Sequence, residues 1–341
     1  MSDVLTTRVL STHTQALREE SVRLAADLLR AGEVVALPTE TVYGLAANAL
    51  DAAAVARVFQ VKERPATNPV IVHVASLEMA RRCASEWPVV AGHLAAAFWP
   101  GPLTLVLPRS GDLPGVVTAG GDTVAVRWPA HPVIQGVIRA CGFPLAAPSA
   151  NRSTQVSPTT CEHVLRSLGG RIPLILDGGP CNVGIESTVV DVTGPVPRVL
   201  RPGMIRPAEI EAVSAIAGAV VQPVDAGGVL RSPGQMPRHY APRIPLEVWA
   251  WEGAEELLAR LRARGLAASQ VCVLAHEHLP PREAGLRRVG VVPADPVAYA
   301  RALYAELHAC DEAGGVCIIV EAPPEDPAWA AIHDRLRRAS A

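Results

Sequence analysis

Short apolar segments alternate with amphipathic helical segments along most of this chain, and that alternation leaves few fold classes open. Apolar side chains recur at helical spacing from Ala16 to Ala31, and Gly32 supplies a stop. Val34 to Leu37 follows as a short strand that ends at Pro38, and Asp51 is placed to cap the next helix. This mixture of apolar strands and helices predicts an α/β sheet covered by helices.

The alternation continues to about residue 213. It predicts strands at residues 70–74, 103–107, 123–127, 145–147, 174–176, 188–192 and 198–200, and helices at residues 77–84, 89–99, 132–141, 160–168 and 207–213. The segment from Lys62 to Pro69 is predicted as a loop. The last two strands are close enough to pair as a hairpin, so we expect a mixed, twisted, open sheet.

Regular periodicity fades from about Gly218 to Pro245, where glycine and proline are frequent, and it resumes beyond. Strands at 246–249, 271–274, 288–292 and 316–320 then alternate with helices at 254–264, 297–309 and 329–338, in Rossmann-like order. A chain of 341 residues is too long for one ordinary core. We therefore expect a first α/β domain at residues 1–207, a linker at 208–245 and a small second α/β domain at 246–341.

Charge balance and cysteine usage argue against several classes of protein. A net charge of −2 argues against a membrane-surface binder, and no stable direct binding of nucleic acid is expected. Residues 1–20 lack the apolar region of a signal peptide, and no stretch reaches the ~18 apolar residues of a membrane span. Seven scattered cysteines fit reduced thiols and a cytoplasmic location. The ten histidines show no tight ligand spacing, so we expect no metal held by protein side chains.

Lys62 is the only lysine among 31 basic residues, and the others are arginines. A coding bias that favours arginine explains the scarcity of lysine. The one lysine that remains is then either a surface residue that survived by chance or a residue kept for its function. Under such a bias, a retained lysine marks a place where a compact ammonium is needed. Lys62 and Arg64 lie two apart on a loop stiffened by Pro65 and Pro69. If the loop is extended, both side chains project to one side and grip different phosphate oxygens.

The familiar phosphate-binding loops are absent. Val61 precedes Lys62, so the Gly-Lys pair of a Walker A loop is missing, and no Gly-x-Gly occurs anywhere. No Gly-x-Ser-x-Gly elbow occurs either. A Schiff-base lysine requires desolvation or a neighbouring cation to lose its proton. The adjacent Glu63 and the polar loop favour a charged ammonium instead.

Polar side chains recur at the ends of the predicted strands. These segments are Pro38–Leu45, Pro148–Asn151, Glu186–Thr188 and Arg201–Gly203, together with Thr123 and Arg127. Ligands of open α/β sheets collect at strand ends. Each segment alone is ordinary turn chemistry, but together they predict a site for a polyanion and a small polar ligand.

These segments also appear in the order of a known family. The sequence resembles the YrdC-like L-threonylcarbamoyladenylate synthases in their long two-domain form. The resemblance rests on Pro38–Leu45, Lys62-x-Arg64, Trp99–Thr104, Val124–Arg127, Ala147–Asn151, Glu186–Thr188, Leu200–Gly203 and the linker motif His239–Pro242. It is specific over about the first 205 residues and the linker, and holds only in outline over the last ~95.

The resemblance implies a YrdC-like sheet in the first domain and a nucleotidyltransferase reaction. L-Threonine, bicarbonate and ATP would give threonylcarbamoyl-AMP and pyrophosphate, and the product would pass to the tRNA threonylcarbamoyl transferase machinery for t6A37 modification. The carbamate of threonine would attack the α-phosphorus of ATP without a covalent enzyme intermediate, so positioning and charge neutralisation would dominate. Mg²⁺ is expected on the phosphates, held largely by substrate oxygens and water.

The resemblance also assigns residues to the two substrates. Lys62 and Arg64 would be catalytic and hold the phosphates of ATP. Asn68, Thr123, Ser149, Asn151, Ser157, Arg201 and Tyr240 would line the nucleotide, with Tyr240 closing over it from the linker as part of a lid. Thr39, His73, Arg127, Ala147 and Ser187 would surround threonine, with Arg127 on its carboxylate. His73 lies in an apolar strand, where a lone histidine is usually a core residue.

Two other functions remain open from the sequence. A double-stranded RNA-binding module is one, because some YrdC-like proteins have a concave basic face, although the net charge weakens it. A carbamoyltransferase accessory domain is the other. Proteins of that kind carry further catalytic or zinc-bearing domains, whereas this chain has only a small α/β appendage and no cluster of zinc ligands.

Overall fold

A computed structural model describes the chain except residues 1–4, 217–221 and 224–237. The described chain forms two compact units. The first unit comprises Met1–Ser153 and Ser157–Gln235, and the second comprises Thr154–Val156 and Met236–Ala341. The two undescribed internal segments fall within the linker predicted at 208–245.

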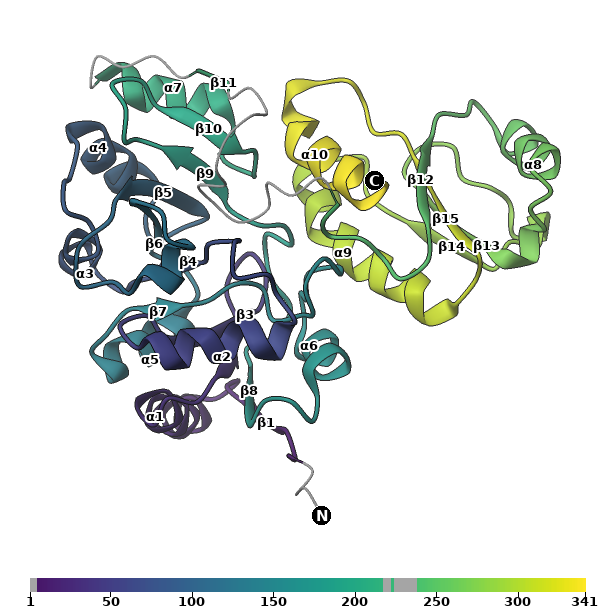
Figure 1. The fold of residues 1–341 in the computed structure, drawn as a ribbon. Helices are drawn as coiled ribbons and strands as arrows, with labels where there is room; N and C mark the ends of the chain where they lie inside the picture. Colours follow the sequence, from purple (N-terminus) through teal and green to yellow (C-terminus); the bar gives the residue numbers. More distant parts are fainter. Residues whose placement is uncertain (1–4, 217–221, 224–237) are drawn as a thin grey trace. The chain divides into compact units, whose positions relative to one another are not determined.

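The first unit is built on a long sheet with helices packed against it (Figure 1). Its strands are β1 (Arg8–Ser11), β2 (Val35–Leu37), β3 (Gly44–Asn48), β4 (Ile71–His73), β5 (Leu103–Pro108), β6 (Thr123–Arg127), β7 (Leu145–Ala146), β8 (Leu174–Asp177), β9 (Thr188–Asp191), β10 (Arg198–Arg201) and β11 (Gln222–Pro223). Its helices are α1 (Gln15–Arg30), α2 (Ala52–Lys62), α3 (Leu77–Arg82), α4 (Val89–Phe98), α5 (Pro132–Cys141), α6 (Cys161–Leu168) and α7 (Pro207–Ile216).

The sheet is mixed, as predicted. Its strand order is β1-β8-β2-β3-β7-β4-β6-β5-β9-β10-β11. Strand β4 runs parallel to β6 and antiparallel to β7, and β5 runs antiparallel to β6 and parallel to β9. The expected hairpin of β9 and β10 is confirmed as an antiparallel pair with an irregular register near Arg201. Strands that are neighbours in this sheet therefore often come from distant parts of the chain. Strand β8 lies between β1 and β2, and β7 lies between β3 and β4.

The two faces of the central strands differ in what covers them. Leu105, Val126 and Val72 point into the main core, which also contains apolar residues of α1, α3, α4 and α5. The opposite face carries a small separate cluster of Ile71, Val106, Ala125 and Val189. Every member of that cluster lies on a strand, so helix packing is concentrated on the other face.

Buried polar residues share the face that carries this small strand cluster. His73, Thr104 and Arg127 each lie two residues from a cluster member on the same strand, and side chains two apart point to the same face. His73 and Arg127 are also direct cross-strand partners in the β4–β6 pair. The register therefore gathers three of the polar groups on one surface of the sheet.

The second unit is a four-stranded parallel sheet with helices (Figure 1). Its elements are β12 (Leu246–Trp249), α8 (Ala254–Ala263), β13 (Val271–Ala275), β14 (Arg288–Val291), α9 (Pro296–Ala313), β15 (Cys317–Glu321) and α10 (Ala330–Ala339), with strand order β12-β15-β13-β14. The all-parallel pairing and the alternation with helices confirm the small α/β fold predicted for the C-terminal part.

Three residues from the middle of the chain belong to the second unit. Gln155 forms an isolated parallel bridge with Ala241, and the amide of Ala241 donates a 2.9 Å hydrogen bond to the carbonyl of Thr154. The chain thus enters the second unit briefly at Thr154–Val156 and returns to the first unit at Ser157.

Three strands of the first unit were not predicted, namely β1, β3 and the two-residue β11, which lies within the predicted linker. Strand β1 is half exposed and contains no long apolar run, so its pairing with β8 leaves little pattern in the sequence. Strand β3 is buried but has the sequence Gly-Leu-Ala-Ala-Asn, whose glycine, alanines and asparagine have low strand propensity. Its neighbours β2 and β7, rather than its own composition, hold it in the sheet.

Gly203 provides a test of the close packing beside β9. A Cβ atom at this position would lie 2.7 Å from Oγ1 of Thr188 and 2.8 Å from the carbonyl carbon of Ser187. We expect Gly203→Ala to lower the free energy of unfolding of the first unit by about 1–3 kcal/mol, because β9 must move. Gly111→Ala is the control, since a Cβ there meets nothing within 4 Å. Equal denaturation midpoints for the two variants would refute the packing argument.

Candidate functional site

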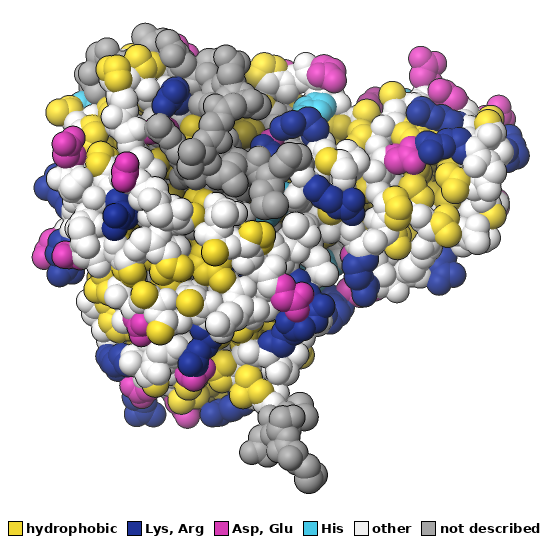
Figure 2. All heavy atoms as spheres, viewed as in Figure 1, with side chains coloured by type: hydrophobic (Ala, Val, Ile, Leu, Met, Phe, Trp, Pro, Cys, Tyr) yellow, Lys and Arg dark blue, Asp and Glu magenta, His cyan; other side chains and the backbone are white. Residues whose placement is uncertain are grey.

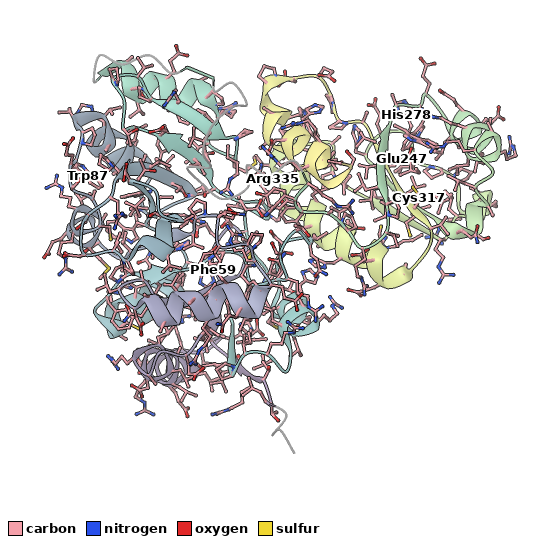
Figure 3. All side chains as sticks on the ribbon, viewed as in Figure 1. Phe59, Trp87, Glu247, His278, Cys317 and Arg335 are labelled. Atoms are coloured by element: carbon pink, nitrogen blue, oxygen red, sulfur yellow. The ribbon has the colours of Figure 1, made fainter. Side chains whose placement is uncertain are left out.

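The prediction that Lys62 lies on a loop is wrong, because Lys62 is the last residue of helix α2. The helix ends there because Glu63 adopts a left-handed backbone with φ of 53° and caps it. Phe59, labelled in Figure 3, lies one turn earlier on the same helix. Lys62 and Arg64 are buried on either side of the cap, with 1% and 7% of their surfaces exposed.

The Lys62 ammonium is surrounded by neutral oxygen atoms. It donates to the main-chain carbonyls of Ser149 and Asn151 and lies 3.5 Å from Oδ1 of Asn151. No carboxylate of the described residues forms an ion pair with it. Burial lowers the pKa of Lys62, and the positive charge of Arg64 lowers it further. Desolvation and a neighbouring cation are thus both present, contrary to the expectation from the polar loop, and Glu63 pairs with Arg171 instead of Lys62. A bound anion would offset both effects and hold Lys62 as an ammonium.

Arg64 shapes the loop that follows α2. Its Nε donates to the carbonyl of Asn68 at 3.2 Å, and Nη2 donates to the carbonyl of Pro69 at 2.8 Å. The amide of Asn68 in turn donates to the carbonyl of Pro65 at 3.2 Å. The predicted nucleotide residues Lys62, Arg64, Asn68, Ser149 and Asn151 are therefore connected through the end of α2 and the loops beside it.

Arg127 is the second buried cation of the site. Its Nη1 donates to Oγ1 of Thr41 at 2.8 Å, and its Nε donates to the carbonyl of Gly101 at 3.3 Å. Its Nη2 lies 2.7 Å from Oε1 of Glu40 in a buried ion pair. Two loops thus fix the plane of one guanidinium, which is the arrangement required for directional binding of a carboxylate.

His73 lies beside Arg127 at the end of β4 and is also buried. Burial lowers the pKa of His73 to about 3, and the positive charge of Arg127 contributes in the same direction. Its Nδ1 has no hydrogen-bond partner among the described residues. His73 is therefore a neutral imidazole at physiological pH, with one ring nitrogen open to a ligand.

Thr39 builds the turn that presents Glu40 and Thr41. Its hydroxyl donates to the carbonyl of Val42 at 2.7 Å and accepts from the amides of Thr41 and Val42 at 3.1 and 3.2 Å. Such side-chain-to-backbone bonds are typical of threonine in tight turns. The turn follows β2 and places two polar side chains against Arg127.

Ser187 and Arg201 are joined, although the sequence assigned them to different substrates. Nη2 of Arg201 donates to the Ser187 carbonyl at 2.9 Å and to its Oγ at 3.1 Å. The Ser187 hydroxyl is also 2.7 Å from Oγ1 of Thr104. This cluster holds the start of β9 against the end of β10 and the start of β5.

The remaining predicted residues of the first unit occupy different places. The buried Ser157 hydroxyl donates to Oε1 of Glu186 at 2.5 Å. Ala147 follows β7, and its amide donates to the carbonyl of Ile71 at 3.0 Å. Thr123 opens β6 whereas Arg127 closes it, so the two are separated by about 13 Å of strand.

Tyr240 belongs to the second unit, where it is buried. Its backbone is left-handed, with φ of 61°. Its ring centroid lies 4.1 Å from that of His239 and 5.9 Å from that of Tyr304. The guanidinium carbon of Arg335, labelled in Figure 3, lies 5.1 Å from the ring centroid, within cation–π range. The assignment of Tyr240 to the nucleotide stays a prediction.

Sequence reasoning missed three residues that the structure places in the site. Glu40 and Thr41 contact Arg127, and Thr104 contacts Ser187. All three lie inside motifs that had been recognised, at Pro38–Leu45 and Trp99–Thr104. For Glu40 and Thr41, the available signal was an acidic residue flanked by two threonines shortly after a predicted strand.

The described residues contain no group of three or more histidine, cysteine, aspartate or glutamate side chains arranged to hold a metal ion. None of the helices described is both long and apolar enough to cross a membrane. Figure 2 shows acidic and basic side chains on the visible surface of both units, in keeping with the net charge of −2.

Family models match both parts of the chain. Residues 27–203 match the Sua5/YciO/YrdC model, which is described as telomere recombination. Residues 205–341 match the model described as the C-terminal domain of threonylcarbamoyl-AMP synthase.

Individual relatives match along nearly the whole chain. The threonylcarbamoyl-AMP synthase of Pyrococcus abyssi is 41% identical over 96% of each chain. The Bacillus subtilis synthase is 40% identical over 94% of this chain and 93% of its own. The structure of P. abyssi Sua5 complexed with L-threonine superposes with a TM-score of 0.87 at 40% identity, covering 98% of this chain and 97% of that one.

The low pKa of His73 predicts a specific loss of stability in acid. Between pH 6.5 and 3 the unfolded chain binds a proton at this position that the folded chain does not, so stability falls as pH falls below 6.5. From pH 7 to pH 5, we expect the wild type to lose about 2 kcal/mol more unfolding free energy than His73→Gln. Denaturant unfolding at both pH values measures this, and an identical pH dependence would show that His73 is not held neutral.

Proposed function

The chain belongs to the threonylcarbamoyl-AMP synthase family in its two-domain form, and we propose that it condenses L-threonine, bicarbonate and ATP into threonylcarbamoyl-AMP and pyrophosphate. The observation that carries the proposal is the whole-chain likeness at about 40% identity to named synthases. The likeness to a Sua5 structure that contains L-threonine supports an amino-acid substrate. The proposal places the enzyme among the nucleotidyltransferases.

Two buried regions of positive charge suit the two substrates. Lys62 and Arg64 supply the charge at the end of α2, which we assign to the phosphates of ATP. Asn68, Thr123, Ser149, Asn151, Ser157, Arg201 and Tyr240 are assigned to the nucleotide. We assign threonine to the surface around Arg127, with Thr39, His73, Ala147 and Ser187. Arg127 has the fixed guanidinium plane that a carboxylate requires.

The chemistry requires positioning and charge neutralisation rather than a covalent enzyme intermediate. The amino group of threonine and bicarbonate form a carbamate with loss of water, and a carbamate oxygen attacks the α-phosphorus of ATP with pyrophosphate as the leaving group. Negative charge builds up on the phosphates during this transfer, and a fixed ammonium nearby stabilises it. We propose that Mg²⁺ accompanies ATP and is bound mainly by phosphate oxygens and water.

Further assignments rest on the same family membership. We propose that the product supplies the tRNA threonylcarbamoyl transferase machinery for t6A37 modification. All seven cysteines are free thiols, which supports a reducing compartment and hence a cytoplasmic location. Tyr240 and its neighbours are assigned to a lid over the nucleotide.

The first test of the proposal is substrate dependence. Pyrophosphate release from ATP should require L-threonine and bicarbonate together, because the attacking carbamate forms only from both. A coupled pyrophosphate assay with each component omitted in turn measures this, and a panel of other amino acids measures selectivity. Pyrophosphate release that persists without threonine would overturn the proposal.

The second test concerns Lys62. Lys62→Ala should lower turnover at least ~100-fold while the fold persists, because the phosphates lose a fixed positive charge. Lys62→Arg should also be strongly impaired, since only 1% of Lys62 is exposed and the larger planar group does not fit the carbonyls around it.

Arg57→Ala is the matched control for both Lys62 variants. Arg57 lies on the same helix, but its side chain is 44% exposed and pairs with the surface residue Glu33. Its loss should leave turnover unchanged. Near wild-type turnover of Lys62→Arg would contradict the need for a compact ammonium.

A further inference from the structure

Glu40 and Arg127 form a buried pair of opposite charges whose hydrogen-bonding capacity is not filled. The two side chains are 9% and 4% exposed, and Oε1 of Glu40 lies 2.7 Å from Nη2 of Arg127. This contact lacks hydrogen-bond geometry: among the described residues, neither carboxylate oxygen accepts a hydrogen bond and Nη2 donates none. Buried carboxylates ordinarily accept several, and leaving such groups unsatisfied is costly.

The neighbouring groups of the pair are already bonded elsewhere, so none of them fills these open positions. Thr41 and Gly101 occupy the other donors of Arg127, and the turn built by Thr39 fixes the backbone of Glu40. The carbonyl of Glu40 also accepts a 2.7 Å hydrogen bond from the amide of Val183. The backbone is therefore held on both sides while the charged end of the side chain keeps free acceptors.

A third open group lies beside the pair. His73 is the cross-strand neighbour of Arg127, and its Nδ1 has no partner among the described residues. The local set thus consists of one cation with an open donor, one anion with open acceptors and one neutral imidazole. A ligand that completes all three carries a negative group, a positive or donating group and a further polar group.

From this arrangement we infer that Glu40 accepts a hydrogen bond from the α-amino group of the substrate and so selects amino acids over other carboxylic acids. The inference rests on the proposed threonine site, with the substrate carboxylate at Arg127. In an α-amino acid one carbon separates the carboxylate from the amino group, so a group bound at Arg127 places its amino group near the adjacent Glu40. The opposite charges of the pair match the two charges of the zwitterion.

A purely structural role for Glu40 makes a different prediction. If Glu40 served only to neutralise Arg127, its loss would change the binding of every carboxylate ligand alike. If it recognises the amino group, its loss affects only ligands that have one. The comparison of L-threonine with its 2-hydroxy counterpart, 2,3-dihydroxybutanoate of the same configuration, separates the two roles.

The experiment is calorimetric binding of both ligands at pH 7.5 to the full-length wild type and to Glu40→Gln. We expect the wild type to prefer threonine and Glu40→Gln to bind threonine about 10- to 100-fold more weakly, the loss typical of a charged hydrogen bond. Binding of the dihydroxy acid should stay within about threefold of wild type. Equal weakening of both ligands by Glu40→Gln would overturn the inference.

Further variants keep the test decisive. Glu40→Asp retains the charge but withdraws it by one methylene, so it should show an intermediate loss of threonine preference even if Glu40→Gln folds poorly. Asp191→Asn removes a different buried carboxylate of the first unit, at the far end of β9 from Ser187, and should lower stability without changing the preference. An unchanged preference in both Glu40 variants would overturn the role of Glu40 alone, whereas a wild type that binds no threonine would overturn the threonine site itself.

Discussion

Burial of positive charge is the physical constraint on which the first unit depends. Lys62, Arg127 and Arg201 are each at most 3% exposed, and an isolated buried cation costs several kcal/mol. Each is therefore bound by oxygen atoms from loops at strand ends. Lys62 organises the loop after β7, Arg127 binds the turn after β2, and Arg201 holds the start of β9. The cations thus shape the loops as well as supplying charge for ligands.

The sheet can hold these buried cations beside ligand-binding loops because different residues cover its two faces. Over the central strands, helices cover one face and build the large core, while a small cluster of strand residues occupies the other. Helices α2 and α6 cover that other face only farther along the sheet, over β2, β3 and β8. On that second face, strand register alone decides which polar side chains are neighbours. A shift of one residue in β4 or β6 would exchange His73 and Arg127 for apolar neighbours, so the chemistry depends on pairing that the core enforces from the opposite side.

The sequence predicted the element types well and the local geometry less well. Periodicity located nearly every helix and strand, because amphipathic helices and apolar strands leave strong patterns. It missed β3, whose alanines resemble no strand, and it placed Lys62 on a loop because a helix that ends in a left-handed glutamate carries no glycine signal. The motifs supplied the candidate site residues, but the pairing of Glu40 with Arg127 and of Thr104 with Ser187 could be read only from the three-dimensional structure. The contact of Thr41 with Arg127 joins residues 86 positions apart, and that of Thr104 with Ser187 joins residues 83 apart, so neither leaves a trace in a local pattern.

The passage of the chain through Thr154–Val156 has a consequence for how the protein can be divided. Because these three residues belong to the second unit, no single cut separates the two units into intact fragments. Removing the chain from Met236 onward would strip Gln155 of its bridge to Ala241. The residues on either side of the segment are Ser153, bonded to the carbonyl of Lys62, and Ser157, bonded to Glu186. A truncation remote in sequence would therefore act mechanically, through the covalent backbone, on Ser153 and Ser157 of the first unit.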